Sequence, residues 1–362
     1  MDSIIDLWYN SEKEKYSPDL IDQLDEYENE LLPIARKNMK RKEKKIPSRM
    51  IINHFTKSYP RPKFMLGPYK LEYFVGDTPN GKLRIYNLYD FHDYIFKTND
   101  EQMFVSNWIY KVLKNSDVFI DVFLEHNVPD RYEEIISLEY GDYLDLGELA
   151  EFAASMNDCI FFKENCPAPN CRIHGADIRR NKYIAESFKN IVNDNEGTEL
   201  TESTVNSLRR KMVKVIKSAK FKKQYRNVPE CIQNVLNNII KKRFRAAIRQ
   251  LKKFEIDEIK NGDAFNLTLG PILMDAYLIS RLFRKFDLRP SDKGMPENIQ
   301  NAIIYTGGYH AKFYSEVLQQ CGFELKFSTG YSYLDMLKSD QQEIKKMRIL
   351  DISNIPYPLF RD

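Results

Sequence analysis

The chain has 362 residues, a length that suits one large domain or two ordinary ones. An apolar fraction of 43%, with 13% aromatic residues, excludes a disordered chain, and the lack of any run of about 18 apolar residues predicts that no helix spans a membrane. The 55 basic and 52 acidic side chains leave a net charge of +3, and the five irregularly spaced cysteines favour a reducing compartment over a disulfide framework.

Residues 1–60 are expected to form a charged, helical N-terminal extension, because leucines recur there among acidic residues. The extension contains a basic decamer at 36–45, which is typical either of a localisation or nucleic-acid tag or of a solvated helix end. Prolines between positions 47 and 62 interrupt regular structure. We therefore expect an α/β domain at 61–362.

The first part of this domain combines a hairpin with a helix and a buried strand. Residues 69–76 and 82–88 alternate apolar and polar side chains around the turn sequence 77–81, which predicts a hairpin. A helix is expected at 103–113, and the apolar run 117–124, broken only by Asp121, has the length of a buried strand. Strand, helix and strand in this order predict a parallel βαβ unit.

A basic helical insertion is expected at about 180–260. Two amphipathic helices, separated by Pro229, repeat apolar residues with the period of an α-helix. Between Arg209 and Lys253, sixteen Lys or Arg residues stand against one acid, Glu230, so this segment carries about +15 and the rest of the chain about −12. The near-neutral total thus conceals a strong division of charge.

The last part of the domain returns to strand and helix. A helix that begins at Pro271 is apolar nearly all round, which indicates a buried element with proline in its first turn. A strand at 301–306 leads through two glycines into a helix at 311–320, and a further strand is expected at 322–327. The predicted fold class is α/β: two βαβ-type portions form a central, mostly parallel sheet flanked by helices, with the helical insertion between them.

Three polar side chains fall at the carboxyl ends of predicted strands, where open α/β sheets bind ligands: His92, Glu125 and His310. Two imidazoles and a carboxylate can hold a divalent metal ion. Alternatively, one histidine acts as a general base that Glu125 orients. Asp90 is placed to support His92, and the glycines before His310 would let a ligand approach backbone N–H groups that suit an anion.

A second polar group lies between positions 166 and 180. Cys171 and His174 have the spacing of zinc ligands, with Cys166 nearby, but no second Cys/His pair follows at the spacing of a zinc finger. The preferred interpretation is a loop that brings Asp177 and Arg179 to the mouth of the site, where arginine can bind a carboxylate or phosphate. A surface ion pair is the alternative.

Asp275 stands among apolar neighbours in the helix that follows Pro271. A buried carboxylate needs a partner or a shifted pKa, and the candidate partners are Arg281, Arg284 and the site histidines. We therefore count Asp275, with Asp90, Asp177 and Arg179, among the supporting residues.

Together these segments resemble the TraB/Tiki/ChaN-like and erythromycin-esterase superfamily. The resemblance rests on the segment 86–92, which ends in His92, on the strand that ends at Glu125, and on the sequence Gly307-Gly308-Tyr309-His310. The chain is most similar to divergent members from giant nucleocytoplasmic DNA viruses, through its AT-rich residue usage and the segments 119–125, 172–179 and 273–281. The resemblance covers roughly 69–327, and Tyr89 departs from it, since the family usually has glycine there.

This resemblance implies a ChaN/Tiki-like domain and a metal-dependent hydrolase, esterase-like or protease-like, acting on a small molecule or a peptide. Carried over by position, it implies that His92, Glu125 and His310 are both the catalytic residues and the ligands of Mn²⁺, Co²⁺ or Zn²⁺. It also implies a viral protein of the host cytoplasm, the viral factory or the virion.

The alternative function is a catalytically inactive virion or viral-factory protein that binds nucleic acid or other partners through its basic helices. The candidate contacts are Lys222, Lys223, Lys241, Lys242, Arg243 and Arg245. The competing interpretation of these residues is a solvated helix face whose charge is met by the acidic remainder of the chain.

Overall fold

The computed structural model describes residues 62–91, 101–125, 166, 168, 170–177, 228–251, 263–286, 288, 294–356 and 359–360. The chain divides into two compact units, Met1–Ser58 and Tyr59–Asp362, and every described residue belongs to the second unit. The predicted extension at 1–60 therefore lies outside the described residues.

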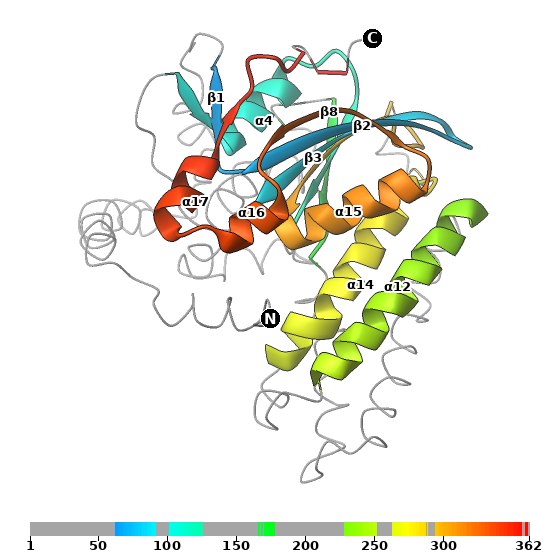
Figure 1. Cartoon of the computed structure of the whole chain (residues 1–362). Coiled ribbons are helices and arrows are strands. Elements are labelled where there is room, and N and C mark those ends of the chain that lie inside the picture. Colours follow the sequence, from blue (N-terminus) through cyan, green and yellow to red (C-terminus); the bar gives the residue numbers. More distant parts are fainter. Residues whose placement is uncertain are drawn as a thin grey trace, which may run out of the picture. The chain divides into compact units, whose positions relative to one another are not determined.

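A six-stranded sheet forms the centre of this unit, with the strand order β6-β5-β7-β3-β2-β8 (Figure 1). Along the chain, the strands are β2 (Lys70–Thr78), β3 (Gly81–Asp90), β5 (Ile120–Leu124), β6 (Cys171–Gly175), β7 (Asn301–Gly307) and β8 (Glu324–Gly330). β6, β5, β7 and β3 pair in parallel, whereas β2 is antiparallel to both β3 and β8. The predicted α/β class, with a mostly parallel sheet flanked by helices, is confirmed.

The predicted hairpin is formed by β2 and β3. Its turn closes with Thr78 opposite Gly81, whose φ of +110° is a conformation that favours glycine. Tyr73 and Tyr86 lie opposite each other in the ladder and stack, with ring centroids 4.4 Å apart.

The predicted βαβ unit differs from the structure in one respect. Helix α4 (Val105–Lys114) connects β3 to β5 along the chain, but β7 lies between these two strands and pairs in parallel with both. A second, three-stranded sheet, in the order β4-β1-β9, combines β1 (Phe64–Leu66), β4 (Gln102–Phe104) and β9 (Ile349–Asp351). Both sheets therefore join segments from the two ends of the domain.

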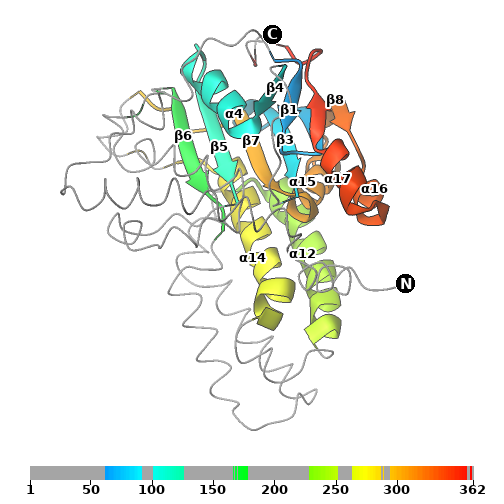
Figure 2. The same ribbon diagram turned by 90° about the vertical axis from the view of Figure 1, so that its left-hand side faces the viewer.

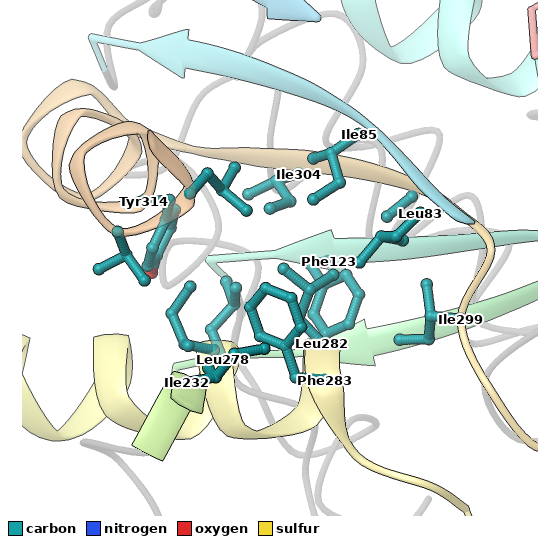
Figure 3. Packing of buried hydrophobic residues seen from close by; sticks show 14 of the residues in the cluster. Leu83, Ile85, Phe123, Ile232, Leu278, Leu282, Phe283, Ile299, Ile304 and Tyr314 are labelled. Atoms are coloured by element: carbon teal, nitrogen blue, oxygen red, sulfur yellow. The ribbon is translucent and has the colours of Figure 1, made fainter. Parts of the chain in front are cut away.

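Three helices cover one face of the large sheet: α12 (Glu230–Leu251), α14 (Asp263–Phe283) and α15 (Gly308–Gln320). They lie side by side in Figures 1 and 2, and α12 and α14 make up the described part of the predicted helical insertion and the helix that follows it. Alternate residues of the strands point into the core beneath these helices. Figure 3 shows Ile85, Phe123 and Ile304 of the sheet packed near Leu278, Leu282 and Phe283 of α14.

Helix α14 begins earlier than the sequence predicts. It starts at Asp263, so Pro271 lies inside the helix and not in its first turn. A proline there removes one backbone hydrogen bond. After the proline, Leu273, Leu278 and Leu282 are buried, and Thr268 is buried before it, so tertiary packing holds the helix across the defect.

The predicted loop after Cys166 is a strand. Residues Cys171–Gly175 pair with Ile120–Leu124 as β6. Strand alternation places Arg172 and His174 on one face of β6 and the buried Cys171 on the other. Cys171, Cys231 and Cys321 are free thiols.

Two short helices follow the large sheet, α16 (Tyr333–Lys338) and α17 (Gln341–Met347). Each begins with a capping box, Ser332 with Asp335 and Asp340 with Glu343. Within the described ranges, no helix has the length and apolar character needed to cross a membrane.

Candidate functional site

Glu125 and His310 meet at the carboxyl edge of the sheet. Glu125 directly follows β5, and His310 lies in the first turn of α15, directly after β7. Because β5 and β7 are parallel neighbours, their ends lie at the same edge, and Glu125 N–H donates to the carbonyl of Tyr305 at 3.2 Å. Glu125 Oε1 is 3.3 Å from His310 Nε2, and both side chains are buried.

The other nitrogen of His310 is held by helix α14. His310 Nδ1 lies 2.6 Å from Asp275 Oδ1, and Asp275 Oδ2 accepts a hydrogen bond from Arg243 Nη1 of α12. On the opposite side, Glu125 Oε2 accepts the N–H of Gly307 at 2.7 Å, at the N-terminus of α15. The four side chains, which we call the His310 row, therefore alternate in charge: Arg243, Asp275, His310 and Glu125.

The charges of the His310 row depend on each other. Burial alone lowers the pKa of His310, but the carboxylates of Asp275 and Glu125 outweigh it and raise that pKa to about 9. Burial likewise raises the pKa of Asp275, but His310 and Arg243 overcome it, and the net shift is downward. Two cations and two carboxylates thus balance within the row near neutral pH.

Tyr309 connects the His310 row with the surface. Its ring centroid is 5.6 Å from that of His310, and the guanidinium of Arg243 lies 5.0 Å from the Tyr309 ring. Tyr309 is 45% exposed, whereas the row itself is buried or nearly so. A solute that approaches the row would therefore meet this aromatic side chain.

A second buried row lies at the β6 edge of the described sheet. Asp121 Oδ1 accepts hydrogen bonds from Arg172 Nε at 2.6 Å and from His174 Nε2 at 2.8 Å. His174 Nδ1 accepts from Arg281, whose Nη2 is 3.0 Å away. We call these four side chains the His174 row.

His174 is neutral in this arrangement, since its Nδ1 accepts a hydrogen bond from a guanidinium. Burial and the charge of Arg281 lower the pKa of His174 to about 3, although Asp121 acts in the opposite direction. The imidazole lies between two rings, with centroids 4.4 Å from Phe123 and 5.6 Å from Phe286.

The predicted site residues are distributed over several places. The structure brings Glu125, His310 and Asp275 together, whereas His92, Arg179, Lys222 and Lys223 lie outside the described residues. Asp90 ends β3, and its carboxylate lies 3.9 Å from Nη2 of the fully buried Arg348. Asp177 follows β6 and is partly buried.

The basic residues of α12 point in different directions. Lys242 and Arg245 are exposed, whereas Arg243 is largely buried. The Arg243 guanidinium lies 4.3 Å from the ring of Phe313 and forms an ion pair with Asp275. Arg243 therefore serves the core of the described domain, a position that the sequence analysis did not anticipate. The side chain of Lys241 is outside the described residues.

Sequence reasoning missed the His174 row, although two signals were present. Asp121 was the only polar residue in an apolar strand, and Arg172 and His174 are two residues apart, so on a strand they share one face. The zinc-like pair does not converge, because Cys171 and His174 are three apart and point to opposite faces of β6. The Cys171 thiol instead donates to the carbonyl of Ala168 at 3.1 Å.

In the part of the chain that the structure describes, no three His, Cys, Asp or Glu side chains are grouped to hold a metal ion on their own. No protein-family model, curated protein or solved structure matches this chain. The resemblance to the TraB/Tiki/ChaN-like superfamily and the functions that it implies therefore stay predictions.

Proposed function

We propose that the protein is a metal-dependent hydrolase in which Glu125 and His310 hold a divalent ion. The observation that carries the proposal is the distance of 3.3 Å between Glu125 Oε1 and His310 Nε2. Two ligands of one tetrahedral ion, with metal–ligand bonds of about 2.0–2.2 Å, lie about 3.3–3.5 Å apart. The two side chains thus have the separation that a shared ion requires, and binding of the ion would release the proton that His310 carries near neutral pH.

The neighbours of these two residues support the same interpretation. Metal-binding histidines usually donate their other ring N–H to a carboxylate, and His310 Nδ1 faces Asp275. The second oxygen of Glu125 is fixed by the Gly307 N–H. Asp275 orients the imidazole so that Nε2 faces Glu125, and Arg243 balances the charge of Asp275.

Two donors do not complete a site, and His92 is the proposed third ligand, although it lies outside the described residues. A divalent ion held here, Mn²⁺, Co²⁺ or Zn²⁺, would supply Lewis-acid activation of a water molecule or an acyl oxygen. The proposed reaction is the hydrolysis of an ester or peptide bond. The proposed setting is the host cytoplasm, the viral factory or the virion of a large DNA virus, as the family resemblance implies.

The test is metal binding by the full chain. Titration calorimetry with Mn²⁺, Co²⁺ and Zn²⁺, and the visible absorption of the Co²⁺ form, should show one site in the unaltered protein. Glu125→Gln and His310→Gln should each weaken binding by more than the roughly 10–100-fold that loss of an outer partner costs.

Glu316→Gln is the matched control, since Glu316 lies on the exposed surface of the same helix as His310. It should bind the ion as the unaltered protein does. The proposal would be contradicted if none of the three ions binds. It would also be contradicted if Glu125→Gln and His310→Gln bind the ion as tightly as the unaltered protein does.

A second candidate function is the binding of nucleic acid by α12. Lys242, Arg245 and Arg249 are exposed and spaced by three and four residues, so they form one basic face of the helix. If this face contacts phosphates, affinity for DNA or RNA should fall steeply with salt. Replacing the three residues by Gln should flatten the salt dependence of binding. The same change at Lys312, Lys326 and Lys338 should not alter it. Binding that is insensitive to salt in the unaltered protein would contradict this candidate function.

A further inference from the structure

The His310 row and the His174 row have similar sequences of partners but different total charges. Each contains an arginine, an aspartate and a histidine in hydrogen-bonded order, and they differ in the fourth residue, which is Glu125 in one row and Arg281 in the other. The formal charges of the His310 row sum to zero when His310 is protonated, since Arg243 and His310 balance Asp275 and Glu125. Arg172, Asp121, neutral His174 and Arg281 sum to +1.

Within the described part of the chain, no carboxylate pairs with Arg281, so the extra positive charge of the row is assigned to it. Its Nε and Nη2 point to His174 Nδ1, at 3.3 and 3.0 Å, and its Nη1 donates to the hydroxyl of Tyr277 at 3.3 Å. Within the described residues, both of these acceptors are neutral. A guanidinium is a fork of donors that matches a carboxylate or a phosphate, and a neutral imidazole uses only part of it.

A second guanidinium lies in the same layer. Arg172 and His174 share one face of β6 and the same oxygen of Asp121, and Arg172 lies 4.0 Å from the ring of Phe286, on which His174 also stacks. The Nη2 atom of Arg172 is buried and has no hydrogen-bond partner among the residues that the structure describes. The Arg281 guanidinium is 5.5 Å from the same ring. The Arg284 guanidinium lies 4.5 Å from it as well. Three cations therefore lie around one phenyl ring, and the His174 row contains a single carboxylate, Asp121.

We propose that Arg281 and Arg172, next to His174, form a binding site for an oxyanion, a carboxylate or a phosphate group. Such an anion supplies the negative charge that Glu125 provides in the His310 row. It accepts from the partly exposed Arg281, whose donors face His174, a weaker acceptor than an anion. The free-energy cost of removing the anion from water is offset by charge-assisted hydrogen bonds from the two guanidinium groups, which are partly buried.

The position of Arg281 in the last turn of α14 has a second physical consequence, since a basic residue there interacts favourably with the helix C-terminus. That interaction stabilises the charge without any ligand. Stabilisation of Arg281 by the helix C-terminus and stabilisation by a bound anion can be distinguished, because only an anion site gives a saturable response to added oxyanion.

The experiment uses the full chain with isotope-labelled histidine and follows the ring signals by NMR. Inorganic phosphate and acetate are titrated separately, each replacing chloride at constant ionic strength. We expect a saturable shift of the His174 signals with little change at His310, and an increase in Tm of about 2–4 °C at several times the apparent Kd. The stronger of the two responses identifies the ligand as phosphate-like or carboxylate-like.

Three variants complete the test. Arg281→Gln should abolish the saturable response, Arg281→Lys should weaken it because the fork is lost, and Lys326→Gln on the exposed strand β8 should leave it unchanged. A lack of saturation with both anions in the unaltered protein would overturn the proposal even if Arg281→Gln does not fold. A response that persists in Arg281→Gln would also overturn it. Glu125→Gln should keep the response, so failure of the metal proposal and failure of this one are distinguishable.

Discussion

At position 308 the fold leaves no room for a side chain, and the residue there is glycine. It begins α15, and a Cβ built on it would lie 1.9 Å from the hydroxyl oxygen of Tyr69. The sequence analysis attributed the space beside these glycines to a ligand, but at Gly308 the space is filled by Tyr69. The anion expected at the neighbouring backbone N–H is the side chain of Glu125, which Gly307 binds.

Gly308→Ala should therefore destabilise the protein by about 1–3 kcal/mol, the usual cost of an overpacked core. Among the described residues, the buried Tyr69 hydroxyl has no hydrogen-bond partner, so Tyr69→Phe should be nearly neutral alone and should recover part of the loss in the double variant. Urea unfolding of the four proteins measures this coupling. Additive effects would show that the contact does not limit position 308.

Which site residues can be read from the sequence depends on how far apart their partners lie. Glu125 and His310 follow strands directly, and the rule that ligands bind at strand carboxyl ends was enough to pair them. Asp275 was recognised as a buried carboxylate, but its partners were not identified, because Arg243 reaches it only through the packing of α12 against α14. Helix packing of this kind leaves no local pattern.

At the scale of elements, the His310 row joins four separate segments. Arg243 comes from α12, Asp275 from α14, His310 from α15, and Glu125 follows β5. The row therefore acts as a cross-link between the three helices and the sheet. Its effect depends on all members, since a buried charge that loses its partner is costly.

Asp275→Asn should cost about 3–5 kcal/mol of unfolding free energy, because it leaves Arg243 and His310 buried without their shared carboxylate. Arg243→Met should also destabilise, and the double variant should lose less than the sum of the two. Denaturant unfolding gives the coupling energy. The exposed pair Lys312 and Glu316 is the control cycle, with an expected coupling of about 0.5 kcal/mol or less, and an equally small value for the buried pair would contradict this account.

The elements themselves were predictable to different degrees. The hairpin, β5, β7 and α15 follow from alternation, apolar runs and glycine punctuation. The predicted start of α14 at Pro271 was wrong, because proline is a strong local signal of a helix start. The tertiary packing that lets the helix continue through Pro271 is not visible in the sequence. β6 was taken for a loop because its short, polar sequence gains its stability from the pairing with β5.

At the scale of the whole molecule, His174 makes folding stability depend on pH. Its pKa is about 3 in the folded protein, because of burial and of Arg281, and about 6.5 in the unfolded chain. Between these values the unfolded state binds more protons at this group, so the contribution of His174 to stability is most favourable above pH 6.5 and falls as the pH decreases. The slope from this one group is at most about 1.4 kcal/mol per pH unit.

His174→Gln should remove that contribution. We expect the variant to be less stable than the unaltered protein at pH 7, with the difference decreasing steadily toward pH 4. Urea unfolding at four pH values in this range provides the measurement. A difference that stays constant between pH 7 and pH 4 would show that His174 does not titrate as its surroundings require.

The central position of β7 determines when the sheet can form during synthesis. β3 and β5 are complete by residue 124, yet the strand that separates them ends only at Gly307. Until then, each has an unpaired edge on the side that β7 will occupy, and loop closure over nearly two hundred residues must precede pairing. A ribosome-bound chain therefore carries two open strand edges through about half of translation. The arrival of β7 then decides whether these edges pair within the sheet or with another chain.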